Sequence, residues 1–90
     1  MGTAVVKIKV MPVSPDVNLE EIKKEIKAIV EKMNGKGCML EEEPIAFGLK
    51  AIIVMFAWPE EKELENLEQA LQSIEDVNSV QVIDIRRAIG

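Results

Sequence analysis

Three adjacent carboxylates, Glu41, Glu42 and Glu43, are the side chains of this 90-residue sequence whose types and spacing first suggest chemistry, because together they could bind a cation. Consecutive residues of a strand point to opposite faces, however, so these carboxylates converge poorly on one ion. A solvated strand end, whose charges discourage pairing with another sheet edge, is the simpler interpretation. We therefore expect no metal and no other cofactor.

Covalent catalysis is not indicated either. Cys38 is the single cysteine, so it cannot form an internal disulfide, and the sequence has no histidine that could activate its thiol. A small buried hydrophobe in a reducing cytoplasm is the usual role of such a cysteine. The sequence also lacks tyrosine, a GxxxxGKS phosphate loop and a paired-cysteine metal motif. We predict a protein that acts by binding, with no covalent chemistry of its own.

Composition restricts the kind of partner. The net charge of −5 argues against binding to a phosphate backbone, which needs a basic face. The aromatic residues are only Phe47, Phe56 and Trp58, too few for a sheet that stacks bases. No window of about 18 apolar residues predicts a membrane span, and no leader is apparent. We expect a single cytoplasmic domain, residues 1–90, that binds a protein rather than a nucleic acid or a membrane.

The first elements follow from alternation and from proline. Val6, Ile8 and Val10 alternate with lysines, which predicts a half-buried strand over Ala4 to Met11. Residues 11–15 contain two prolines, which cannot donate hydrogen bonds to a sheet, so this segment is predicted to be a loop.

A helix should follow this loop. Asn18 with Glu21 three residues later predicts a capping box, and an apolar stripe at helical spacing runs from Leu19 to Met33. Asn34-Gly35 should end the helix, with Gly35 in the left-handed conformation.

The centre of the chain predicts two strands joined by a turn. Residues 38–43 form the weaker strand, residues 44–48 the turn, and residues 49–58 a strongly apolar strand. The bulkier face of that strand should enter the core because buried apolar area stabilises the fold. This face comprises Ile52, Val54, Phe56 and Trp58.

The other face of the same strand carries Ala51, Ile53 and Met55. If helices cover only one side of the sheet, these residues lie on its open face, beside Lys7 and Lys9. Such an apolar strip is either tolerated surface or a contact site.

The last third predicts a second helix and a last strand. Pro59 and the acidic residues after it suit a helix N-terminus. Residues 76–79 should form a turn, residues 80–85 a strand, and residues 86–90 a tail. The apolar stripe of the helix comprises Leu64, Leu67, Leu71 and Ile74.

The element order is strand, helix, strand, strand, helix, strand. Two right-handed crossovers can interleave into one four-stranded antiparallel sheet with both helices on one face. The single apolar stripe on each helix fits such a two-layer arrangement. We therefore predict an α+β ferredoxin-like sandwich with strand order 4-1-3-2.

The segment Pro44-Ile45-Ala46-Phe47-Gly48-Leu49-Lys50, with residues 8–12 and 82–85, resembles archaeal translation elongation factor 1-beta. That family is related to the exchange domain of the eukaryotic elongation factor 1-beta subunit. The resemblance covers essentially the whole chain and implies the same sandwich fold. It also implies guanine-nucleotide exchange, promoting GDP release on elongation factor 1-alpha, the GTPase that delivers aminoacyl-tRNA to the ribosome.

The resemblance also implies site residues. The GTPase contact would comprise Pro44, Ile45, Ala46, Phe47, Gly48 and Lys50. In the eukaryotic relatives, a lysine near the C-terminus reaches the magnesium and phosphate region. Here Arg86 or Arg87 could supply that charge, although neither occupies the position of the family's lysine. The alternative for Phe47 is a turn residue folded onto the end of the sheet, and for the arginines a solvated strand end.

Two other functions fit the same architecture. A small-molecule regulatory or oligomerisation domain could use Ala51, Ile53 and Met55 to dimerise. A small phosphatase is a weaker alternative, because the arginine and the phosphate-binding glycine loop are missing before the first helix. We expect a monomer or a weak homo-oligomer.

Overall fold

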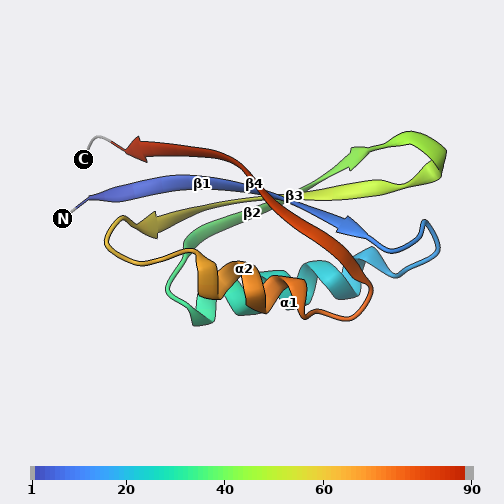
Figure 1. Cartoon of the computed structure of the whole chain (residues 1–90), viewed down its shortest axis with the longest axis horizontal. Coiled ribbons are helices and arrows are strands. Elements are labelled where there is room, and N and C mark those ends of the chain that lie inside the picture. Colours follow the sequence, from blue (N-terminus) through green and yellow to red (C-terminus); the bar gives the residue numbers. More distant parts are fainter. Residues whose placement is uncertain (1, 89–90) are drawn as a thin grey trace.

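The predicted elements occur in the predicted order in a computed structural model, which describes residues 2–88 (Figure 1). All strand pairs are antiparallel, and the order β2-β3-β1-β4 confirms the ferredoxin-like topology. Neither helix of the described chain is long and apolar enough to cross a membrane. The elements are β1 (Thr3–Pro12), α1 (Leu19–Lys32), β2 (Lys36–Pro44), η1 (Ala46–Gly48), β3 (Lys50–Pro59), α2 (Glu65–Gln72) and β4 (Val77–Ala88).

The core lies between the sheet and the two helices. The alternation in β1 and β3 places one set of side chains toward the helices, and the bulkier set of β3 is buried there as predicted. α1 contributes its apolar stripe and α2 contributes Leu67 and Leu71, whereas Leu64 and Ile74 reach the core from the residues that flank α2. No polar side chain of the described residues is buried without a hydrogen bond. The fully buried side chains include Val6, Ile8, Val10, Ile26, Val30, Ile52, Val54, Leu67 and Leu71.

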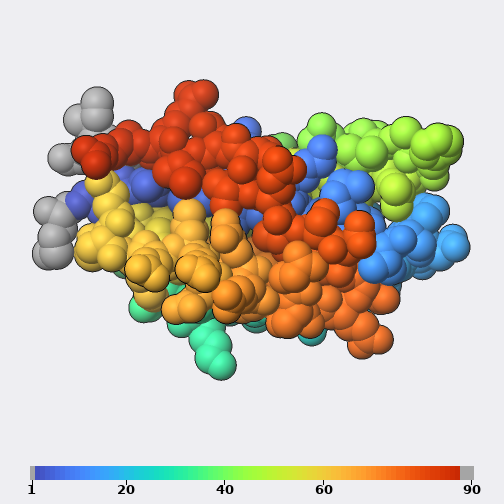
Figure 2. Space-filling view, viewed as in Figure 1, coloured from blue at the N-terminus to red at the C-terminus, as the bar shows by residue number. Residues whose placement is uncertain are grey.

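The sheet is longer than the helices that cover it. The 14 residues of α1 span about 21 Å at the helical rise, whereas a ten-residue strand spans about 33 Å. The molecule measures 42 Å along its longest axis, and both ends of the sheet extend past the helix layer (Figure 1). In Figure 2 the β2–β3 hairpin (green) projects at one end and the last residues of β4 (red) lie at the other.

The first and last strands of the chain are longer than predicted. β1 continues through Pro12, which pairs with Val77 after a register shift. Pro12 is tolerated because it is the last residue of the strand, where a missing donor interrupts no further pairing. β4 likewise runs from Val77 to Ala88, so Arg86 and Arg87 belong to a strand and not to a tail. The remaining tail residues, 89 and 90, lie outside the described residues.

α1 starts and ends where predicted, but the detail at each end differs. The Asn18 side chain accepts hydrogen bonds from the amides of Glu20 and Glu21, although the Glu21 side chain forms no return bond. Asn34, not Gly35, takes the left-handed conformation, with φ of 73°. Gly35 is required by close packing instead, because a Cβ there would lie 2.5 Å from Val30 Cγ1.

The second helix begins later than predicted. Pro59 is the last residue of β3, and α2 starts only at Glu65. The intervening turn is held by side chains: the Trp58 indole N–H donates to the Lys62 carbonyl oxygen at 2.9 Å. The Lys62 ammonium donates to the carbonyl oxygen of Met33 at 2.6 Å and lies over the Trp58 ring. These contacts stabilise a turn where helix was expected.

The apolar strip predicted on the open face of β3 is largely covered. Ala51 is fully buried, Ile53 is 9% exposed and Met55 is half-buried. β3 is an inner strand, so long side chains of β1 and β2 lie over it, and Lys7 and Met39 line a small cavity above Ile53 and Met55. The strip is therefore not the exposed surface that the dimerisation alternative required.

Replacing Leu67 by alanine should destabilise the fold. Leu67 is fully buried between α2 and the sheet, so the truncation should lower the free energy of unfolding by about 2–5 kcal/mol. Urea denaturation measures this change. Asn66→Ala, at an exposed position of the same helix, is the matched control and should leave the midpoint almost unchanged. Equal midpoints for the two variants would contradict the packing described above.

Candidate partner-binding site

The loop between β2 and β3 is a tightly closed hairpin. Pro44 pairs with Lys50 at the end of the ladder, and the Ile45 amide donates to the Leu49 carbonyl oxygen at 2.7 Å. The Leu49 amide donates to the carbonyl oxygen of Ala46 at 3.3 Å. Ile45 and Leu49 are half-buried, so they anchor the base of the loop. The short turn η1 is thereby held at the tip.

Phe47 forms the tip of this turn and points into solvent. Phe47 is 95% exposed, which excludes the alternative in which its ring folds onto the end of the sheet. Its backbone is left-handed, with φ of 64° and ψ of 30°, a conformation that costs a side-chain-bearing residue roughly 1–2 kcal/mol. An exposed ring in a strained backbone does not stabilise the fold, and such features cluster at functional sites.

Gly48 continues the left-handed turn with φ of 78°. A Cβ at this position would meet only Pro15 Cβ, at 3.9 Å, so glycine is needed for its conformation and not for space. The loop after β1 lies beside this turn, and the two loops enclose a cleft of about 290 Å³. The cleft is lined by Pro12, Ser14, Pro15, Leu19, Gly48 and Lys50.

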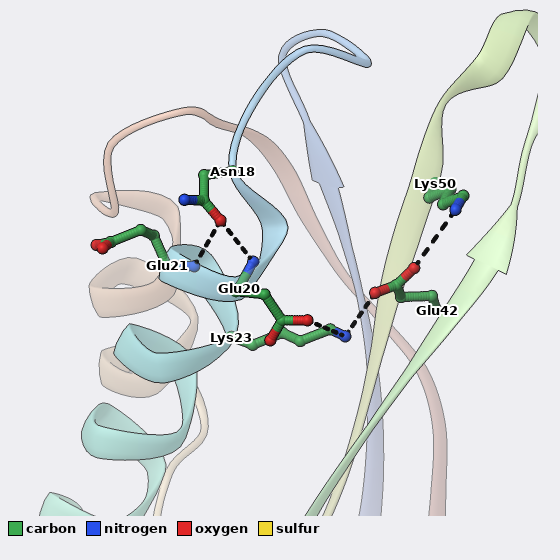
Figure 3. A network of polar contacts seen from close by, with 6 residues as sticks. All are labelled: Asn18, Glu20, Glu21, Lys23, Glu42 and Lys50. Carbon is green, nitrogen blue, oxygen red and sulfur yellow. Dashed lines mark hydrogen bonds and ion pairs between the residues drawn. The ribbon is translucent and has the colours of Figure 1, made fainter.

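Figure 3 shows a polar network that joins the hairpin to α1. Glu42 pairs with Ile52, so its side chain lies on the helix side of the sheet. The Glu42 carboxylate contacts Lys23 Nζ at 2.5 Å and Lys50 Nζ at 3.7 Å. Glu20, in the first turn of α1, lies 3.6 Å from the same Lys23 nitrogen. One carboxylate of the hairpin therefore lies between two lysines of different elements.

Both partners of the shortest contact are held in their charged forms. The hydrogen bond from Lys23 is the main reason that the pKa of Glu42 is lowered from its ordinary value of 4.5. The hydrogen bond to Glu42 is likewise the main reason that the pKa of Lys23 is raised from 10.5, against the effect of its burial. The ion pair is thus complete throughout the neutral pH range.

A solvated strand end therefore does not describe Glu42, whose carboxylate forms two ion pairs. Glu41 and Glu43 pair with Ile53 and Ala51 and lie on the open face, as the alternation predicted. No group of three or more potential ligand side chains in residues 2–88 is placed to hold a metal. The ion pair between Lys23 and Glu42 was not predicted. Strand alternation predicts that the Glu42 side chain lies on the opposite face of the sheet from those of Glu41 and Glu43. Only the pairing register of β2 with β3 shows that this face is the one covered by the helices.

Arg86 and Arg87 lie at the end of the sheet opposite Phe47. They pair with Val5 and Ala4 in β1, close to Thr3, which in turn pairs with Pro59 in β3. The hairpin is at the Lys50 end of the same strand (Figure 1). The structure therefore does not bring the two predicted parts of the site together.

The two arginines also project from opposite faces of the sheet. Arg86 shares the open face with Asp84, whose carboxylate oxygen lies 2.9 Å from Arg86 Nε. Arg87 lies on the helix side, with its Nε 3.1 Å from a carboxylate oxygen of Glu60. Both side chains are more than four-fifths exposed, so these pairs hold them weakly. A partner that approaches one face meets only one of these guanidinium groups.

Cys38 lies neither at the Phe47 hairpin nor at the end of the sheet that carries the two arginines. Its half-buried side chain packs against the core, and burial, with a smaller contribution from Glu31, raises the pKa of its thiol. A protonated thiol is a poor nucleophile. Cys38 therefore behaves as a packing residue.

The fold defines a class: a ferredoxin-like sandwich, with an exposed aromatic hairpin at one end of its sheet and two exposed arginines at the other. Residues 5–88 match the family described as the EF-1 guanine nucleotide exchange domain. The chain is 46% identical over 88 residues to elongation factor 1-beta of Methanothermobacter thermautotrophicus, covering 97% of this chain and 98% of that protein. It is 42% identical over 89 residues to elongation factor 1-beta of Methanocaldococcus jannaschii, covering 98% and 100%. The chain belongs to the elongation factor 1 guanine-nucleotide exchange family, and these relatives are archaeal.

A solved structure confirms the fold independently. The ACT domain from the GTP pyrophosphokinase of Chlorobium tepidum superposes with a TM-score of 0.60, covering 88% of this chain and 96% of that domain. Its sequence is only 16% identical, so the likeness concerns the architecture alone. It does not support the regulatory-domain alternative over the family assignment.

The left-handed backbone at Phe47 predicts an unusual stability order. Phe47→Gly should be more stable than Phe47→Ala by about 1 kcal/mol, because glycine adopts positive φ without strain. Chemical denaturation of the two variants measures the difference. Ala46→Gly is the matched control one residue earlier, where φ is not positive, and should instead lower stability. A Phe47→Gly variant no more stable than Phe47→Ala would contradict the strained conformation.

Proposed function

We propose that the chain promotes GDP release, and hence GDP/GTP exchange, on translation elongation factor 1-alpha in the cytoplasm. Membership of the exchange-domain family supports this function. The single structural observation that carries the proposal is the exposed, strained Phe47 at the tip of a rigid hairpin. The contact surface would comprise Pro44, Ile45, Ala46, Phe47, Gly48 and Lys50.

Exchange of this kind requires no bond to be made or broken by the factor. Suppose that a protein binds the nucleotide-free GTPase more tightly than the GDP-bound GTPase. The ratio of these two affinities is then also the ratio by which the protein weakens GDP binding. The role of this chain would therefore be differential affinity.

Phe47 is suited to act as the docking residue. Aromatic side chains dominate many protein interfaces because they bury a large area with few rotatable bonds. The closed hairpin has already fixed the backbone around Phe47, so binding would immobilise little more than its ring. The neighbouring cleft offers the partner a second surface at the same end.

A cation at the other end could act on the nucleotide. GDP in a GTPase is held by magnesium and by P-loop amides, and an inserted positive charge would disturb that site. Arg86 and Arg87 are the candidates, and each would have to leave its carboxylate partner. Because they face opposite sides of the sheet, we propose that only one of them acts.

Release of fluorescent GDP from elongation factor 1-alpha tests this function. Catalytic amounts of the chain should accelerate release, and Phe47→Ala should reduce the acceleration at least about tenfold at subsaturating concentration, as expected for a hot-spot aromatic. Met39→Ala, which truncates another exposed apolar side chain, is the control and should retain activity. An unchanged release rate with the wild-type chain would reject the proposal, and a fully active Phe47→Ala would remove Phe47 from the site.

Separate replacement of the two arginines tests the action on nucleotide. If one guanidinium enters the nucleotide site, then Arg86→Gln or Arg87→Gln should lower the maximal release rate several-fold, and the other should change it little. The half-saturating concentration should stay nearly constant, because docking occurs at the opposite end. Lysine at the sensitive position should restore part of the rate by returning the charge. If neither substitution changes the maximal release rate, the end of the sheet that carries Arg86 and Arg87 does not act on the nucleotide.

A further inference from the structure

We infer that Glu42 is a positioning residue for docking: by binding Lys23 and Lys50 together, it fixes the direction of the hairpin that carries Phe47 relative to α1. This inference rests on the proposed function. Glu42 and Lys23 both lie outside the tip of the loop.

The second half of β2, residues 41–44, has few contacts beyond its pairing with β3. β2 is an edge strand, paired only with β3, and its partly buried side chains are Cys38 and Leu40 in its first half. From Glu41 to Pro44 no side chain belongs to the core or packs against it. Among the ion pairs and side-chain hydrogen bonds of residues 2–88, the Lys23–Glu42 contact alone joins this half of the strand to the helix layer.

The geometry of the network suits an orienting role. Lys23 projects from the first turns of α1, whose start is fixed by the Asn18 cap, so the anchor itself is well placed. Lys50 begins β3 and lies 3.7 Å from the other oxygen of the same carboxylate. Glu42 therefore bridges α1 to both arms of the hairpin (Figure 3). Only 19% of the Lys23 side chain and 31% of the Glu42 side chain are exposed, so the contact is partly shielded from water.

Loss of this bridge should affect binding more than folding. The hairpin ladder and its turn remain intact without it, and partly exposed ion pairs contribute little to global stability. The hairpin would instead sample several directions, and the fraction with Phe47 correctly placed would fall. An apparent dissociation constant rises in inverse proportion to that fraction.

The test compares Glu42→Gln with Glu43→Gln in the GDP-release assay, over a range of factor concentrations. Glu42→Gln should raise the half-saturating concentration roughly threefold to fivefold, the range expected for a partly shielded ion pair, and leave the maximal rate unchanged. Glu43→Gln, on the opposite face of the same strand, should behave as wild type. Lys23→Gln should reproduce the Glu42→Gln effect, and the double variant should add nothing further.

Variants that also lack the Phe47 ring show whether Glu42 acts through it. In a Phe47→Ala background, Glu42→Gln should have no additional effect, whereas a general structural role would still lower activity. Equal behaviour of Glu42→Gln and Glu43→Gln, or an undiminished effect without the Phe47 ring, would overturn the inference while leaving the exchange function standing. A wild-type chain that does not stimulate release would overturn the proposed function and this inference with it.

Discussion

Burial of the helix-facing side of β1 and β3 is the interaction on which the rest of the structure depends. Val6, Ile8 and Val54 are fully buried between the sheet and the helices. At one end of this layer Phe56 and Trp58 meet edge to face, with ring centroids 5.7 Å apart. A one-residue slip of β3 would move Val54, Phe56 and Trp58 to the face of the sheet that no helix covers, so the register of β3 is strongly fixed. A fixed register of β3 in turn determines which residues form the two ends of the sheet.

Those two ends are the parts that the helices leave uncovered. Each strand residue rises about twice as far as a helix residue, so strands and helices of similar residue count cannot cover one another completely. The excess length becomes the β2–β3 hairpin at one end and the last residues of β4 at the other (Figure 1). The surfaces that we propose for binding are therefore consequences of this difference in length, and they lie where changes disturb the core least.

The sequence predicted what depends on local pattern and missed what depends on pairing. Alternation in residues 49–58 and the stripes of both helices gave the fold, the core and the strand order, and the family resemblance singled out Phe47. The extension of β1 through Pro12 and of β4 through Arg87 was missed, because strand ends are set by the partner strand. The covering of Ile53 and the bridge from Glu42 to Lys23 were missed for the same reason. Each requires the register of two strands, which a single sequence does not contain.

A rigid sheet between two separated binding surfaces has a mechanical consequence under the proposed function. Docking at Phe47 would place the far end of β3 and its neighbours at a fixed distance and direction from the contact, because β3 is packed on both faces along most of its length. Free energy gained at the aromatic contact could then offset the cost of moving an arginine away from its carboxylate and into a site already occupied by magnesium and phosphate. If a flexible linker joined the two ends, binding of Phe47 would not force the arginine toward the nucleotide, since the cation could remain in solvent while Phe47 stayed bound. The stiffness of the core is thus what would allow a contact at one end of the molecule to weaken nucleotide binding at the other.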